Sequence, residues 1–115
     1  MTLDDWDAVV AFALTLPETE MSTSYGAPAV KVNGKLLVSL SREPDSFHVI
    51  AGHDEKAILL ETDPDTFWQT PHYEGWAGLL VRYGSADPDR VRRVISRAWW
   101  DRLKAAQRKA YGDRP

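Results

Sequence analysis

The sequence contains no cysteine in its 115 residues, so disulfides, thiolate metal ligands and a thiol nucleophile are all excluded. It also lacks long hydrophobic runs, since the longest, at 8–14 and 76–81, are far shorter than the roughly 20 residues that a membrane-spanning helix needs. The first residues, MTLDDWD, are acidic where a secretory signal is basic and then apolar. We therefore expect a cytoplasmic protein that does not bind membranes.

Several catalytic patterns are missing as well. The sequence has no phosphate-binding loop, no dinucleotide fingerprint and no nucleophile elbow. The histidines His48, His53 and His72 lack the spacing of a metal-binding set, and His48 is more simply explained as a sheet residue with a satisfied hydrogen bond. No carboxylate pair stands out from the other acidic residues. We therefore expect no cofactor and no metal, and we favour a protein that is not an enzyme.

The composition is that of an ordinary globular chain, with 43% apolar and 27% charged residues. The length suits one domain, and no repeat, low-complexity tract or long linker divides the chain. The sequence therefore predicts a single domain over residues 1–115.

Capping and turn residues mark the expected elements. Apolar residues at helical spacing predict a helix over 6–16, with Thr2 and Asp5 as a capping box and Pro17 as its end. Asn33-Gly34 suits a two-residue hairpin turn, and Asp87 with Pro88 suits the start of a long C-terminal helix. The other expected segments are an extended connection at 16–28, hairpin strands at 29–32 and 35–41, a strand at 46–52, a short helix at 53–61 capped by Asp54, and strands at 67–70 and 76–83.

This order of elements determines the fold class. Adjacent strands joined by short turns form an antiparallel sheet, and helices at the two ends of the chain can cover one of its faces. The sequence therefore predicts an α+β fold, a two-layer sandwich with the N- and C-terminal helices packed on the same face.

Charge is distributed unevenly. Residues 1–86 carry 5 Lys/Arg and 13 Asp/Glu, whereas residues 87–115 carry 9 Lys/Arg and 4 Asp/Glu. The two segments together give the net charge of -3. In the long C-terminal helix, five cations and one tryptophan share the side opposite the apolar stripe. Such a surface suits a polyanion, although a solvated face with Trp100 packed elsewhere fits equally well. The residues are Arg90, Arg93, Arg97, Trp100, Lys104 and Arg108.

Two other segments offer candidate binding residues. In TPHYEGWAGLLVRYG, His72 and Trp76 can stack on a base and Arg82 can pair with a phosphate, or Trp76 simply fills the gap between sheet and loop. Lys31 and Lys35 flank the Asn-Gly turn, but a two-residue turn directs them to opposite faces unless it is bulged.

The stretches YGAPAVKVNGKLLVSLS, TPHYEGWAGLLVRYG and VRRVISRAWWDRLK together resemble the MmcQ/YjbR family of small bacterial proteins, over about residues 3–108. The resemblance implies a frataxin-like (CyaY-like) α+β fold. Members are commonly labelled DNA-binding, with a paired wing shape that here corresponds to the Lys31–Lys35 turn and the His72–Trp76 loop. Iron binding through first-helix acids is disfavoured, because Asp4, Asp5 and Asp7 are too few.

These observations leave three hypotheses. The first is a non-enzymatic module that binds DNA or another polyanion. The second is a protein-interaction domain that binds an acidic partner or a second copy of itself. We expect the protein to be a monomer or a weak homodimer. The third is a small-ligand pocket near Tyr25, His72 and Trp76, which requires these side chains to converge.

Overall fold

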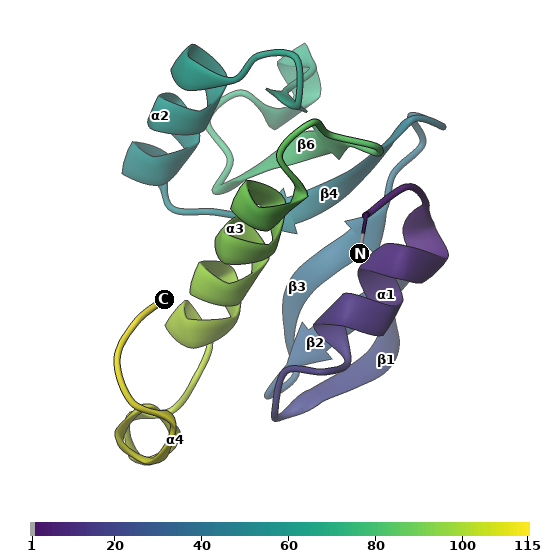
Figure 1. The fold of residues 1–115 in the computed structure, drawn as a ribbon. Helices are drawn as coiled ribbons and strands as arrows, with labels where there is room; N and C mark the ends of the chain where they lie inside the picture. Colours follow the sequence, from purple (N-terminus) through teal and green to yellow (C-terminus); the bar gives the residue numbers. More distant parts are fainter. Residues whose placement is uncertain (1) are drawn as a thin grey trace.

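The computed structural model describes residues 2–115 and contains one six-stranded antiparallel sheet, in the order β1-β2-β3-β4-β6-β5 (Figure 1). The strands are β1 (Thr19–Ser24), β2 (Ala27–Val32), β3 (Lys35–Leu40), β4 (Ser46–Ile50), β5 (Phe67–Trp68) and β6 (Gly78–Arg82). The helices are α1 (Trp6–Ala13), α2 (His53–Thr62), the 3-10 turn η1 (Pro71–Tyr73), α3 (Pro88–Asp101) and α4 (Ala105–Tyr111).

Helix α1 near the N-terminus and the long helix α3 lie on the same face of the sheet, as Figure 1 shows in purple and green. Val9 of α1 and Ile95 of α3 are fully buried in one core with the inward-facing residues of the strands, such as Phe47, Val49 and Leu79. Burial of these side chains from both layers is what holds the helices on the sheet. The predicted α+β sandwich is confirmed. Within residues 2–115, no helix is both long and apolar enough to cross a bilayer.

Two helix starts differ from those expected. Asp5 alone caps α1, because its carboxylate accepts the Ala8 amide at 2.8 Å, while the Thr2 hydroxyl donates to Asp4. The predicted Thr2–Asp5 capping box is therefore wrong. Helix α2 begins after Gly52 and has no side-chain cap, so Asp54 lies inside its first turn. Helix α3 starts as expected, with the Asp87 carboxylate accepting the Arg90 amide.

The expected connection over 16–28 is wrong, because it contains the edge strand β1. All six residues of β1 pair with β2, and the hairpin closes through Tyr25-Gly26. Both turn residues have positive φ, 50° and 80°, which is the geometry of a tight two-residue hairpin. An asparagine commonly marks such a turn, and a tyrosine rarely does.

The expected continuous C-terminal helix is also wrong, because the chain bends between α3 and α4. The amides of Arg102 and Leu103 bond back to the carbonyls of Trp99 and Trp100, which tightens and ends the helix. On a straight helix, Leu103 would point roughly 130° away from the apolar stripe. The bend instead buries Leu103 in the core, where it is 5% exposed. Burial of this leucine accounts for a break that contains neither glycine nor proline.

Candidate functional site

Apart from Arg82 and Arg93, the predicted binding residues fall into three separate regions. One gathers five of them around the β2–β3 turn and the α3–α4 junction, and we name it the basic corner. The second lies between α2 and α3, and the third is the loop that carries η1. The basic corner consists of Lys31, Lys35, Trp100, Lys104 and Arg108.

Hydrogen bonds from Asn33 build the basic corner. Its side-chain amide donates to the Arg102 carbonyl at 3.2 Å and to Gln107 Oε1 at 2.8 Å. Gln107 Nε2 in turn donates to Asn33 Oδ1 at 3.2 Å, and Gln107 Oε1 also accepts the Lys104 amide. Arg102 Nε adds a bond to the Leu36 carbonyl at 2.9 Å. The turn is thereby fixed against the start of α4, although the two are about 70 residues apart in the sequence.

The β2–β3 turn itself has the predicted geometry. Asn33 and Gly34 have φ values of 52° and 77°, and Val32 pairs with Lys35. Lys31 pairs with Leu36, and the register shifts only beyond that pair. The bulge therefore lies outside the turn, and Lys31 and Lys35 start on opposite faces of the sheet. An anionic chain lying across the edge of this hairpin can meet both lysines, whereas a compact ligand on one face cannot.

Helix α4 folds back onto the end of α3. The Arg108 guanidinium lies 5.9 Å from the Trp100 ring and donates to the carbonyls of Trp100 and Asp101. Tyr111 packs on Trp99 and donates to Glu18, and the Trp99 indole donates to the Pro17 carbonyl. Trp100 is therefore partly buried under Arg108 and is not the open stacking surface that a straight helix would present.

Of the remaining predicted cations on α3, two contact α2 and one is exposed to solvent. Arg97 pairs with Glu55, and each of these side chains is only 20% exposed. Arg90 donates to the Thr62 hydroxyl and lies over the Phe67 ring at 5.7 Å. These two arginines thus face a cavity beside α2, so the predicted single stripe along the last helix is wrong. Arg93 is exposed, with no ion pair or side-chain hydrogen bond to any residue in 2–115.

The loop over 70–77 exposes the rings of His72 and Trp76. His72 and Trp76 lie 5.7 Å apart, and Trp76 is 51% exposed, so the interpretation of Trp76 as a packing residue is wrong. Lys56 of α2 fixes this loop, because its ammonium donates to the carbonyls of Tyr73 at 2.7 Å and Trp76 at 2.8 Å. Burial lowers the pKa of Lys56, and the nearby Glu74 opposes that shift. Sequence reasoning missed Lys56, since a lysine among helix acids resembles a solvated residue.

His48 lies beneath this loop on the face of the sheet opposite α1 and α3. Its ring stacks on Tyr73 at 5.1 Å and is 6% exposed, and Nε2 has no hydrogen-bond partner within residues 2–115. The expected satisfied hydrogen bond is therefore missing. Burial, and secondly the charge of Lys56, lower the pKa of His48 to about 4. The ring is neutral at pH 7.

Arg82 and Tyr25 have other roles. Arg82 donates to the carbonyls of Pro64 and Asp65 and stacks 4.6 Å from the Trp68 ring, so it holds the β5 edge in place. Tyr25 is fully exposed beside β1, at the opposite edge of the sheet from β5 and β6. The hypothesised pocket of Tyr25, His72 and Trp76 does not form. No cluster of three or more His, Asp or Glu in 2–115 is arranged to hold a metal ion.

Comparison with known proteins adds a family and a fold. A family model described as YjbR matches residues 14–101. The uncharacterized proteins Rv2570 of Mycobacterium tuberculosis and Mb2600 of Mycobacterium bovis are each 26% identical over 80 residues, or 66% of this chain and 62% of theirs. The match thus spans less than two thirds of those relatives.

Among solved structures, the crystal structure of Deinococcus radiodurans protein DR2400, a DUF419 domain, matches with a TM-score of 0.73. The match covers 94% of this chain and 88% of that chain at 12% sequence identity. At this identity the likeness shows the fold alone.

Proposed function

Because this chain belongs to the YjbR family, we propose that it is a non-enzymatic nucleic-acid-binding module, and that DNA or another polyanion lies across the basic corner. The observation that carries the proposal is the set of Asn33 hydrogen bonds, which joins cations from two distant parts of the chain. Phosphate groups along an extended backbone can each meet one of these cations, which is the main source of sequence-independent affinity.

The cations of the basic corner differ in their exposure and in whether they already have a partner. Lys35 and Lys104 are exposed, and neither has an acidic partner within residues 2–115. Lys31 is half-buried and lies directly opposite Glu20 on β1, while Arg108 is shared with backbone carbonyls. Lys35 and Lys104 are therefore the two residues on which phosphate contact should depend most.

Charge reversal with a matched control tests the proposal. Labelled single-stranded and duplex DNA are titrated by fluorescence anisotropy at low and moderate salt. Lys35→Glu with Lys104→Glu should weaken binding at least about tenfold, because two favourable phosphate contacts become repulsive. Arg42→Glu with Arg93→Glu changes the net charge by the same amount away from the corner and should have a much smaller effect. An equal loss of DNA affinity in both double variants would refute the proposal. So would the absence of DNA binding by the unmodified protein at low salt.

The half-exposed Trp76 beside His72 favours a second candidate function, a protein-interaction domain. A large aromatic on a fixed loop is a common anchor of protein interfaces. Light scattering over a concentration series tests the form in which a second copy is the partner. A mass that rises with concentration, and that Trp76→Ala returns to the monomer value, would support it, whereas a constant monomer mass would exclude self-association.

A further inference from the structure

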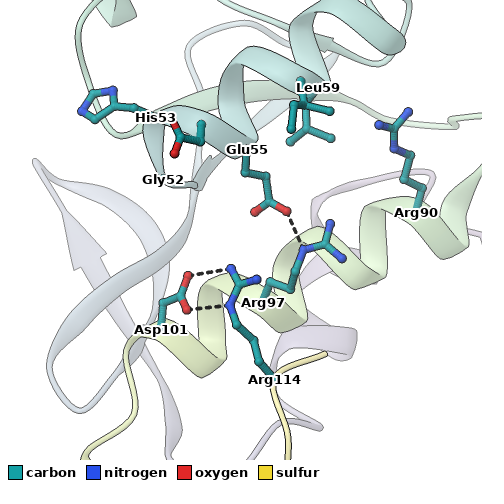
Figure 2. A pocket seen from close by; sticks show the side chains of 10 residues that line it. Gly52, His53, Glu55, Leu59, Arg90, Arg97, Asp101 and Arg114 are labelled. Atoms are coloured by element: carbon teal, nitrogen blue, oxygen red, sulfur yellow. Dashed lines mark hydrogen bonds and ion pairs between the residues drawn. The ribbon is translucent and has the colours of Figure 1, made fainter.

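A cavity of about 510 Å³ lies between α2 and α3, in the size range of small-molecule sites (Figure 2). Figure 2 shows Arg97 and Arg90 entering it from α3 and Arg114 entering it from the C-terminal segment. The wall on the α2 side includes Ile58, which is 55% exposed, and Leu59, which belongs to the core. The cavity thus combines a cluster of guanidinium groups with a small apolar surface.

Each arginine has donors that no group within residues 2–115 accepts. Arg97 uses Nε on Glu55, which leaves both Nη groups free. Arg114 uses Nε and Nη2 on the two oxygens of Asp101, at 2.9 and 3.0 Å, which leaves Nη1. Arg90 uses Nη2 on Thr62, which leaves its own Nη1. The acids therefore hold two of the guanidinium planes from one side and leave N–H groups available on the other.

We propose that this cavity binds a small phosphate-bearing molecule. Guanidinium groups match phosphate oxygens with charge-assisted hydrogen bonds. Donors approach from α3 on one side and from the C-terminal segment on another, which suits the tetrahedral oxygens of a phosphate better than the two coplanar oxygens of a carboxylate. Ile58 offers a contact for an apolar group esterified to that phosphate. The site is distinct from the basic corner and does not depend on nucleic-acid binding.

The carboxylates of the cavity limit the affinity. Asp54, Glu55 and Asp101 line it with the three arginines, so the formal charges balance before a ligand enters. A phosphate therefore gains from local hydrogen bonds to fixed guanidinium groups instead of from a net positive field. Inorganic phosphate should bind with a Kd on the order of 1 mM, about 4 kcal/mol.

Titration with inorganic phosphate, followed by NMR of the backbone amides and the arginine Nε–H groups, tests the proposal. Saturable shifts should appear at Gly52, at His53 and at the Arg97 side chain. Arg97→Gln combined with Glu55→Gln leaves a neutral pair that can still form a hydrogen bond, and should weaken binding at least tenfold. Arg114→Gln removes a half-exposed side chain of the C-terminal segment together with its charge pair with Asp101, and should weaken binding several-fold. Arg93→Gln, an exposed change on the same helix, is the matched control and should have no effect.

Phenyl phosphate is the second probe. Tighter binding than inorganic phosphate would assign the site to a phosphate ester, and equal binding would assign it to free phosphate. The Lys35→Glu, Lys104→Glu variant should bind both probes normally, which separates this site from the basic corner. The proposal is overturned if inorganic phosphate gives no saturable shifts, or if the Arg93→Gln control loses as much affinity as the cavity variants.

Discussion

Gly78 and His48 touch across the central strands β4 and β6. A Cβ atom placed on Gly78 would lie 2.5 Å from His48 Nε2 and 3.1 Å from the Val49 carbonyl oxygen. The first distance is shorter than any real contact, so the imidazole occupies the space that a side chain at position 78 would need. Only glycine at position 78 allows the ring to lie flat between the strand and Tyr73.

This contact predicts a strongly non-additive pair of substitutions. Gly78→Ala should lower the free energy of unfolding by about 1–3 kcal/mol, because the added methyl group overpacks the site. In a His48→Ala background the same change should cost at least about 1 kcal/mol less, since the nearest atom is gone. Urea unfolding of the two single variants and the double variant measures this coupling. Additive effects would show that the ring does not constrain position 78.

The depressed pKa of His48 predicts acid-sensitive stability. The pKa of His48 is about 4 in the folded protein, against an ordinary value of 6.5, so the unfolded chain binds a proton more readily. Stability from this group is fully present above pH 6.5, is lost as the pH falls toward 4, and levels off below that. The loss can reach about 3 kcal/mol.

Urea midpoints measured from pH 4 to 7 test this expectation. His48→Gln keeps a polar side chain of similar reach without a titrating group, so the difference between the two proteins isolates His48 from the carboxylates. The difference should vary with pH across that window. Parallel curves would mean that His48 is protonated as easily in the folded state as in the unfolded one.

At the scale of the elements, Asn33 joins a turn to a helix junction and has two separable roles. Its φ of 52° lies in the left-handed region, and its amide bonds to Arg102 and Gln107. Asn33→Gly keeps the backbone geometry and removes the bonds, which should cost about 1–2 kcal/mol. Asn33→Ala removes the hydrogen bonds and also places a residue that disfavours the left-handed region at this position. It should therefore cost roughly 1 kcal/mol more than Asn33→Gly. Thermal or urea unfolding measures both variants, and an alanine variant as stable as the glycine variant would contradict the backbone role.

The same variants also test whether the basic corner depends on this junction. Asn33→Gly removes no charge, so a polyanion-binding surface assembled by these bonds should lose affinity for DNA even though every lysine is retained. Unchanged affinity in the folded variant would show that the cations bind independently of the junction.

The sequence predicted those elements whose local signals agree with the tertiary structure. Asn33-Gly34 favours a tight turn and Asp87-Pro88 favours a helix start, and the tertiary packing agrees with both preferences. Both features lie where expected. The edge strand β1 was missed because Thr19–Ser24 has one large apolar residue, Met21, which is itself 51% exposed. An edge strand without a buried face has no alternating pattern to detect.

The candidate site was less predictable, because its contacts depend on where the last helix bends. Helical periodicity placed six residues on one face, but burial of Leu103 ends α3 and moves Lys104 and Arg108 onto or beside α4. Arg90 and Arg97 then face α2, whose position beside α3 is a tertiary property. The position of the turn that carries Lys31 and Lys35 beside the start of α4 likewise depends on hydrogen bonds between residues about 70 positions apart.

At the scale of the whole molecule, the cationic surplus of residues 87–115 is outweighed by the acidic surplus of residues 1–86. The net charge is -3, and residues 1–86 contribute a surplus of eight acids. Arg82, Arg97 and Arg114 are each paired with a carboxylate. Any affinity for nucleic acid should therefore come from a small number of local contacts and not from the field of the whole protein.

The salt dependence of DNA binding measures that number. Each phosphate neutralised on duplex DNA contributes about -0.9 to the slope of log K against log salt. The four cations of the basic corner, Lys31, Lys35, Lys104 and Arg108, therefore limit the slope to about -3.6. Lys35→Gln should make the slope shallower by about 0.9, and Arg93→Gln should leave it unchanged. A slope much steeper than -3.6, or one that responds to Arg93 and not to Lys35, would place the phosphates along α3 and remove the basic corner from the binding surface.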